Sequence, residues 1–206
     1  MESINSINFK AQPLNKINIQ MYEKKSKSFI PCTVTFVRLD ASNKTDMEAI
    51  EKSAKTWKNS RYIQRIATAA HWMNIVPIEV YALTRQQKNF SKLNHNKILG
   101  FAEMRTDDND KRFKSLYYLQ VREEARNINN PKNKTYKKVG SSILTSLKNI
   151  YKNISLFSDG GTALEQFYTK NNFIKDAACP KRFLWSSDYL MKLKIYIENI
   201  RKRFGR

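Results

Sequence analysis

The sequence contains few cysteines, few acidic side chains and no long apolar run. Its two cysteines, Cys32 and Cys179, lie far apart and in no metal-ligand spacing, which argues against a disulfide scaffold and a cysteine zinc site. Two reduced thiols in a cytoplasm are the simpler expectation, and one disulfide is the alternative. No apolar run approaches the roughly 18 residues of a membrane span, and the start MESINSINFK lacks the features of a signal peptide. We therefore predict a cytoplasmic protein with no transmembrane segment and no metal site.

Basic residues greatly outnumber acidic ones. Lysine and arginine total 38 against 18 aspartate and glutamate, a net charge of +20. Such a field attracts nucleic acid, anionic lipid or a polyphosphate cofactor. The richness in Lys, Asn and Ile also fits A·T-rich codons, so the charge alone does not decide between partners. With 41% hydrophobic and 12% aromatic residues, 206 residues suffice for one folded domain with extensions.

Period-two and period-3.6 patterns alternate along the middle of the chain. A helix over 46–57 is expected to start at a capping box formed by Thr45 and Glu48. Strands alternating with helices predict an α+β or mixed-sheet domain. The expected strands are 32–40, 78–83, 97–105, 114–121, 154–157, 173–174 and 182–186, and the expected helices are 46–57, 61–73, one from near 140 and one from 162.

The two ends of the chain differ from this domain. Residues 1–31 show no sustained periodicity and predict an extension that is flexible or loosely docked. Residues 187–206 carry apolar side chains at spacings of three and four among lysines and arginines, which predicts a basic amphipathic helix. Docking onto the domain, a dimer contact, an anionic membrane surface and RNA all remain open for this helix. Its apolar residues are Leu190, Leu193, Ile197, Ile200 and Phe204.

The segment from residue 116 to 147 predicts an anion site. A strand, a polar loop and a helix starting near Gly140 follow one another. The first turn of a helix leaves backbone N–H groups unpaired, and the helix dipole favours an anion there. Lys137 and Lys138 add charge, and Gly140 lets a ligand approach the backbone closely.

Two motifs resemble those of the GCN5-related N-acetyltransferase (GNAT) family. The segment 139–144, VGSSIL, resembles the end of its acetyl-CoA pyrophosphate loop. The segment 167–173, FYTKNNF, resembles its second signature, an aromatic pair followed by charged residues, a turn and a phenylalanine. The resemblance covers roughly residues 32–186 and implies a GNAT-like acyl-CoA N-acyltransferase fold, an α+β domain whose mixed, mostly antiparallel sheet is flanked by helices.

The resemblance also implies a reaction and a site. GNAT enzymes transfer the acetyl group of acetyl-CoA to a primary amine by direct attack on the thioester, and the acceptor is a small molecule or an amine on a protein or tRNA. The backbone of Leu119 and Val121 would hold the pantetheine arm, and Tyr168 would protonate the departing thiolate. The pyrophosphate would lie over the backbone N–H groups of Lys137, Lys138, Val139, Gly140 and Ser141.

The chain departs from the family pattern at several positions. The pattern places arginine or glutamine, glycine and glycine at Thr135, Lys138 and Gly140, of which only the last is kept. A catalytic glutamate of one family branch falls on Ser115, so Glu103 on the neighbouring strand is the nearest candidate for a base, through a water. These departures support an alternative, a catalytically degenerate GNAT-fold module that binds RNA or another polyanion.

Three acidic residues, Asp107, Asp108 and Asp110, form the densest acidic cluster of the chain. Turn chemistry explains them, since aspartate is common in turns. A counter-charge for a cationic amine acceptor is the alternative.

Overall fold

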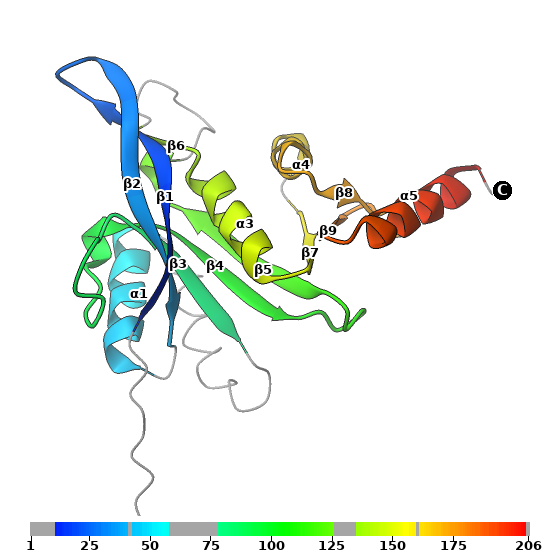
Figure 1. The fold of residues 1–206 in the computed structure, drawn as a ribbon, viewed down its shortest axis with the longest axis horizontal. Helices are drawn as coiled ribbons and strands as arrows, with labels where there is room; N and C mark the ends of the chain where they lie inside the picture. The colour runs from blue at the N-terminus through cyan, green and yellow to red at the C-terminus, as the bar shows by residue number, and fades with distance from the viewer. Residues whose placement is uncertain (1–10, 41–42, 58–77, 126–134, 160, 205–206) are drawn as a thin grey trace, which may run out of the picture.

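A single mixed sheet organises the chain. The computed structural model describes residues 11–40, 43–57, 78–125, 135–159 and 161–204 (Figure 1). Nine strands lie in the order β6-β1-β2-β3-β4-β5-β7-β9-β8, and every neighbouring pair is antiparallel except β5–β7. The predicted α+β fold, with a mostly antiparallel sheet flanked by helices, is confirmed.

The bounds of the elements follow the sequence patterns closely in the second half of the chain. Strands Lys114–Val121 and Arg182–Ser186 begin and end where the pattern predicts. The strands are β1 Gln12–Glu23, β2 Ser28–Leu39, β3 Glu79–Thr84, β4 Ile98–Thr106, β5 Lys114–Val121, β6 Tyr136–Lys137, β7 Asn153–Phe157, β8 Ile174–Lys175 and β9 Arg182–Ser186. The helices are α1 Lys44–Thr56, α3 Val139–Ile150, α4 Gly161–Lys170 and α5 Tyr189–Phe204, with short 3₁₀ helices His95–Lys97 and Glu123–Ala125.

The sheet separates two apolar cores because successive side chains of a strand point to opposite faces. On β4, Phe101 belongs to the core that contains Ile50 of α1, whereas Ala102 belongs to the core that contains Ile143 of α3. Gly100 brings α3 close to the sheet. A Cβ at Gly100 would lie 2.7 Å from Ile143 Cδ1 and 3.0 Å from the carbonyl oxygen of Gln120. The missing side chain therefore sets the depth at which α3 packs.

The predicted loose extension over residues 1–31 is wrong for residues 12–31. Strands β1 and β2 form a long antiparallel hairpin, paired from Gln12 with Arg38 to Glu23 with Ser28. Ile17, Ile19 and Met21 alternate inward to the core under α3. This alternation is hard to recognise in the sequence because only one face of the strand is apolar. Its apolar residues stand singly among asparagine, glutamine and lysine residues.

Two further expectations concern the first helical region. The predicted capping box at Thr45 is wrong, since Asn43 caps α1: its side-chain oxygen accepts hydrogen bonds from the backbone N–H groups of Thr45 and Asp46. The predicted helix over 61–73 lies outside the described residues. The predicted C-terminal helix is present as α5.

Candidate active site

Strands β5 and β7 part in the middle of the sheet. Their parallel ladder runs from Lys114, opposite Ile154, only to Leu116, opposite Leu156. Strand β5 continues beyond this point to Val121, paired with β4. We call the point where the β5–β7 ladder ends the β5–β7 fork.

A β-bulge explains the fork. On the other side of β5, Glu103 pairs with Tyr118 and Met104 pairs with Leu116, so Tyr117 is an extra residue in β5. An extra residue bends its strand and increases the local twist. Because the bulge lies directly after Leu116, it turns the end of β5 away from the direction of β7.

Helix α3 begins beside the end of β5 without a side-chain cap. Its first intrahelical hydrogen bond runs from the Ser142 N–H to the Lys138 carbonyl, at 2.8 Å. The N–H groups of Val139, Gly140 and Ser141 therefore precede the hydrogen-bond ladder of the helix, and within the described part of the chain none has a backbone acceptor. Together with the helix dipole, these donors form a site for an anion.

Lys138 precedes α3 in the left-handed conformation, with φ of 66°. This conformation favours glycine because a side chain is strained there. It is also the position where the GNAT pattern has glycine. This chain thus places a lysine in a backbone conformation that glycine adopts readily, and the exposed side chain of Lys138 adds a positive charge at the helix start.

Three elements meet at Gly140. A Cβ placed there would lie 3.0 Å from Phe167 Cζ on α4 and 3.9 Å from Val121 Cγ1 at the end of β5. The contact of Phe167 with Gly140 does not follow from the sequence, in which the aromatic pair of the second motif is its only signal. The ring of Phe167 and the side chain of Val121 therefore both lie close to the first turn of α3.

Strand β6 holds the residues before α3 in place. Lys137 pairs with Gln20 of β1, and the Tyr22 N–H donates to the Thr135 carbonyl at 2.8 Å. The ammonium group of Lys137 lies 3.7 Å from the ring centroid of Phe29, a cation–π contact. The Lys137 side chain is therefore directed to the β1–β2 hairpin, and only its backbone belongs to the start of α3.

Tyr168 lies in the core under α3. Its ring packs against those of Phe167, Phe173 and Phe183, with centroids 5.3, 6.0 and 5.7 Å away. Burial raises the pKa of the Tyr168 hydroxyl, so this group stays protonated at neutral pH and can donate a hydrogen bond. The hydroxyl has no hydrogen-bond partner among the described residues, and the residue as a whole is 9% exposed.

Glu103 is 1% exposed and pairs with Arg105. The Arg105 Nε and Nη2 atoms lie 2.6 and 2.5 Å from Glu103 Oε1, while Oε2 has no hydrogen-bond partner among the described residues. Its neighbours Ala102 and Met104 face the core under α3, so Glu103 points to the opposite face of the sheet. Tyr168 and Glu103 are thus on different faces and do not meet directly.

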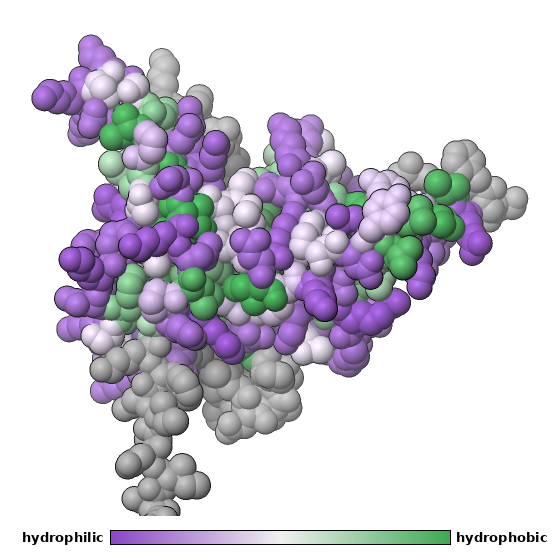
Figure 2. All heavy atoms as spheres, in the orientation of Figure 1, coloured by the Kyte–Doolittle hydropathy of each residue, from purple (hydrophilic) through white to green (hydrophobic). Residues whose placement is uncertain are grey.

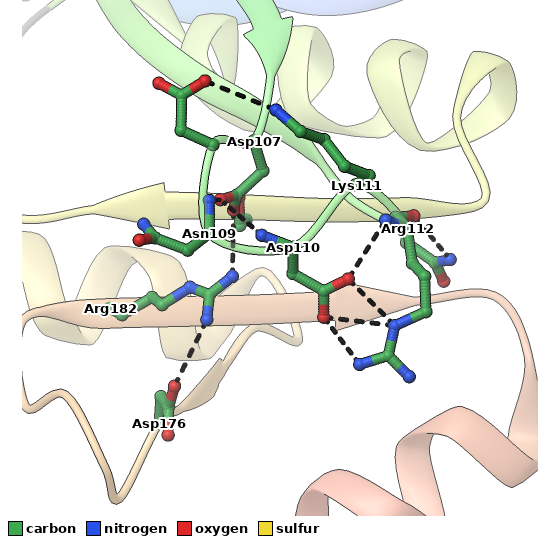
Figure 3. Close-up of polar contacts among 10 residues, drawn as sticks. Asp107, Asn109, Asp110, Lys111, Arg112, Asp176 and Arg182 are labelled. Carbon is green, nitrogen blue, oxygen red and sulfur yellow. Dashed lines mark hydrogen bonds and ion pairs between the residues drawn. The ribbon is translucent and has the colours of Figure 1, made fainter.

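The acidic cluster is a folded turn (Figure 3). The buried carboxylate of Asp107 accepts hydrogen bonds from the Ser155 hydroxyl, from the Asn109 N–H at 2.9 Å and from Arg182 Nη2 at 2.9 Å. Burial raises the pKa of Asp107, but these hydrogen bonds outweigh it and lower the pKa below its ordinary value. Because Asp107 is neutralised by Arg182, the turn chemistry explains it and no acceptor counter-charge is needed.

No family model and no curated protein matches the sequence of this chain. Solved structures do match its fold. A mutant of the toxin AtaT, bound to the C-terminus of the antitoxin AtaR and acetyl-CoA, aligns with a TM-score of 0.50 at 10% identity, covering 78% of this chain and 98% of the other. An acetyltransferase of the GNAT family from Desulfovibrio desulfuricans aligns at 0.48 with 9% identity, covering 74% and 98%. The chain has a GNAT-like fold.

Metal-binding clusters, membrane-spanning helices and disulfide bonds were sought among the described residues of this GNAT-like fold. They contain no group of three or more His, Cys, Asp or Glu side chains placed to hold a metal ion. None of the helices in the described ranges combines the length and apolar composition needed to cross a bilayer. Cys32 and Cys179 are both free thiols.

Proposed function

We propose that this protein is an acetyl-CoA-dependent N-acetyltransferase that transfers an acetyl group to a primary amine by direct attack on the thioester. The observation that carries the proposal is the β5–β7 fork beside the uncapped start of α3. At the first feature, the part of β5 beyond Leu116 is not paired with β7, and the second feature offers backbone donors to a diphosphate.

Acetyl-CoA fits these two features in order. Its pyrophosphate would accept hydrogen bonds from the backbone N–H groups at the start of α3, with the Lys138 ammonium beside it. Its pantetheine arm would lie along Leu119 and Val121 as an added strand. Both side chains pack toward the core under α3, the face that also holds Tyr168. The phosphate-binding residues are Lys137, Lys138, Val139, Gly140 and Ser141.

The reaction needs two proton transfers. When acetyl-CoA is bound, an amine would attack the carbonyl carbon of its thioester, and the carbon–sulfur bond would break. The Tyr168 hydroxyl would donate a proton to the departing thiolate, and Glu103 Oε2 would accept the proton lost by the amine through a water molecule. Since Tyr168 and Glu103 lie on opposite faces of the sheet, the thioester would sit in the β5–β7 fork, with the cofactor entering from the α3 face and the amine from the other face.

Calorimetric titration with acetyl-CoA tests the cofactor part of the proposal, and the absence of binding at millimolar cofactor would overturn it. For the chemistry, Tyr168→Phe is expected to lower kcat by roughly 100- to 10,000-fold, the range typical of a lost general acid, with the affinity for acetyl-CoA kept. An equal loss of affinity and turnover would show that Tyr168 acts through packing. Glu103→Gln is expected to lower kcat with little change in cofactor affinity.

The acceptor is open to direct assay. Small amines, amines on proteins and aminoacyl-tRNA can each be offered with labelled acetyl-CoA, and transfer to one class identifies it. The charge of +20 favours an acceptor carried by a polyanion.

A second candidate function is polyanion binding without catalysis. The observation that favours it is the β1–β2 hairpin, which extends past β3: β2 pairs with β3 only from Thr35 onward, whereas its pairing with β1 continues to Ser28 (Figure 1). Its exposed tip carries Lys24, Lys25 and Lys27. RNA binding that weakens steeply with salt, together with no binding of acetyl-CoA, would favour this function over the first.

A further inference from the structure

Helix α5 exposes an apolar face that the rest of the domain leaves uncovered. Leu190, Leu193, Ile197 and Ile200 are each between 40% and 65% exposed. Figure 2 shows hydrophobic atoms gathered along this helix at the edge of the molecule. Two tyrosines complete what we call the outer face of α5, which consists of Tyr189, Leu190, Leu193, Tyr196, Ile197 and Ile200.

The helix is already anchored to the domain by its other side. Ile195 and Met191 pack with Phe113 and Leu184. The Asn199 side chain accepts a hydrogen bond from the Ala177 N–H at 2.8 Å and donates one to the Lys175 carbonyl, also at 2.8 Å. At about 100° per residue, the mean direction of Met191, Ile195 and Asn199 lies about 180° from that of the four aliphatic residues of the outer face. The contacts that hold α5 against the domain therefore do not use its outer face.

Basic side chains border the outer face on both sides. With the same helical spacing of about 100° per residue, Lys194 and Arg201 fall along one edge and Lys192 falls along the other. The only acidic side chain within α5, Glu198, falls outside the apolar arc. The long stems of lysine and arginine can lie along an apolar surface while their charges reach polar groups at its boundary.

We propose that the outer face of α5 binds an anionic lipid surface, with the helix lying in the plane of the membrane interface. Aliphatic side chains would enter the acyl boundary, while Tyr189 and Tyr196 would lie at the headgroup level, where amphipathic rings are favoured. The flanking lysines and arginine would meet the lipid phosphates.

The charge pattern disfavours the other occupants. In a two-fold dimer through the outer face, each basic edge would meet a basic edge of the second copy, and the single Glu198 is the only acidic side chain of α5 to set against these lysines and arginine. Nucleic acid would pair with the lysines and arginine but would leave the aliphatic side chains without an apolar partner. A membrane surface with anionic headgroups has an apolar interior for the aliphatic side chains and negative phosphates for the lysines and arginine.

The test is co-sedimentation of the full chain with phosphatidylcholine vesicles that contain either no phosphatidylglycerol or about one third of it. We expect binding to the anionic vesicles only. Ile197→Asp and Leu193→Asp should each lower binding at least tenfold, because both residues belong to the outer face. Ile150→Asp, at an exposed apolar residue on α3, is the matched control and should bind like the unaltered chain.

The charge arm uses Lys194→Ser with Arg201→Ser, expected to weaken binding by roughly fivefold for each residue. Lys55→Ser on the exposed surface of α1 is its control. Unchanged binding of Ile197→Asp would overturn the proposal in favour of a charge-only interaction. The absence of binding to anionic vesicles would also overturn it. So would a dimer that Ile197→Asp abolishes, or binding of an acidic protein, in place of lipid, that the same variant abolishes. Retained acetyl-CoA binding or thermal stability in each variant shows that it is folded.

Discussion

Helices α1 and α3 differ in whether a side chain of the protein accepts hydrogen bonds from the unpaired backbone N–H groups of the first turn. Helix α1 satisfies its first N–H groups internally: the Asn43 side chain accepts from the Thr45 and Asp46 N–H groups at 2.9 and 3.4 Å. Helix α3 has no side-chain cap, and Lys138 stands at its start in the left-handed conformation. Within the described residues, one helix start is closed by a side chain of the protein and the other has no side-chain acceptor.

The charges follow the same division. The first turn of α1 contains Asp46, a negative charge that complements the helix dipole, whereas the first turn of α3 contains no acidic residue. Helix α3 therefore presents a positive end that no acidic residue of its own first turn complements. This contrast supports the start of α3, and not that of α1, as the proposed binding site.

Converting the α3 start to negative charge should have the largest effect on binding. Lys138→Asp replaces a cation with an anion where the pyrophosphate is proposed to lie, so acetyl-CoA affinity is expected to fall by about 100-fold or more. The stability of the fold should change little, because an acidic residue at a helix start is favourable. Calorimetry measures the first and urea unfolding the second. An unchanged affinity would remove α3 from the proposed site.

Moving α3 away from the sheet should have the next largest effect. Gly100→Ala introduces a Cβ at 2.7 Å from Ile143 Cδ1, and we expect a loss of about 1–3 kcal/mol in the free energy of unfolding from overpacking. Ile143→Val removes that methyl group, so the double variant should recover part of the loss. Additive losses in the double-mutant cycle would mean that the two residues do not limit each other.

Removing the cap of α1 should affect stability alone. Asn43→Ala is expected to lower the free energy of unfolding by about 1 kcal/mol and to leave acetyl-CoA affinity unchanged. Lys138→Gly relieves a left-handed residue, so it should raise the free energy of unfolding by about 1 kcal/mol, and it should weaken acetyl-CoA binding several-fold through the lost charge. A loss of acetyl-CoA affinity in Asn43→Ala, or none in Lys138→Gly, would contradict the contrast between the two helix starts.

The smallest effect concerns Asp46 at the start of α1. Burial raises the pKa of its carboxyl, only partly offset by a hydrogen bond from the Asp40 N–H, and its Oδ1 atom has no partner among the described residues. The folded state then holds the proton more tightly than the unfolded state, so stability falls as the pH rises from the ordinary value of 3.8 through the raised pKa. Asp46→Asn is expected to remove this fall and to stabilise the fold at pH 7 by up to about 1 kcal/mol. Urea unfolding between pH 4 and pH 7, at about one-unit steps, measures it.

Local patterns predicted the parts of the fold whose structure is set locally. Apolar spacing predicts the strand Lys114–Val121 and the helix that begins at Val139. The two motifs lead to Gly140 and Tyr168 as candidate site residues. Strand β1 was missed because its inward residues, such as Ile19, are single apolar residues among polar ones and are recognised as a strand only once β2 pairs with them.

The geometry of the candidate site depends on pairing between distant segments, which spacing does not reveal. The bulge at Tyr117 exists only in the register of β5 against β4, and the end of the β5–β7 ladder exists only where the two strands meet. The opposite orientation of Glu103 and Tyr168 also became visible only in the folded sheet. The left-handed conformation of Lys138 could be inferred from the glycine that the family pattern has there, but not from lysine itself.

The most direct test of the account is a titration of acetyl-CoA followed by amide chemical shifts. The backbone N–H signals of Val139, Gly140 and Ser141 are expected to move together and to saturate, because these are the donors proposed to bind the pyrophosphate. Those of Thr45 and Asp46, already bonded to Asn43, should remain in place. Acetyl-CoA that binds without moving the α3 signals, or that does not bind at all, would contradict the account.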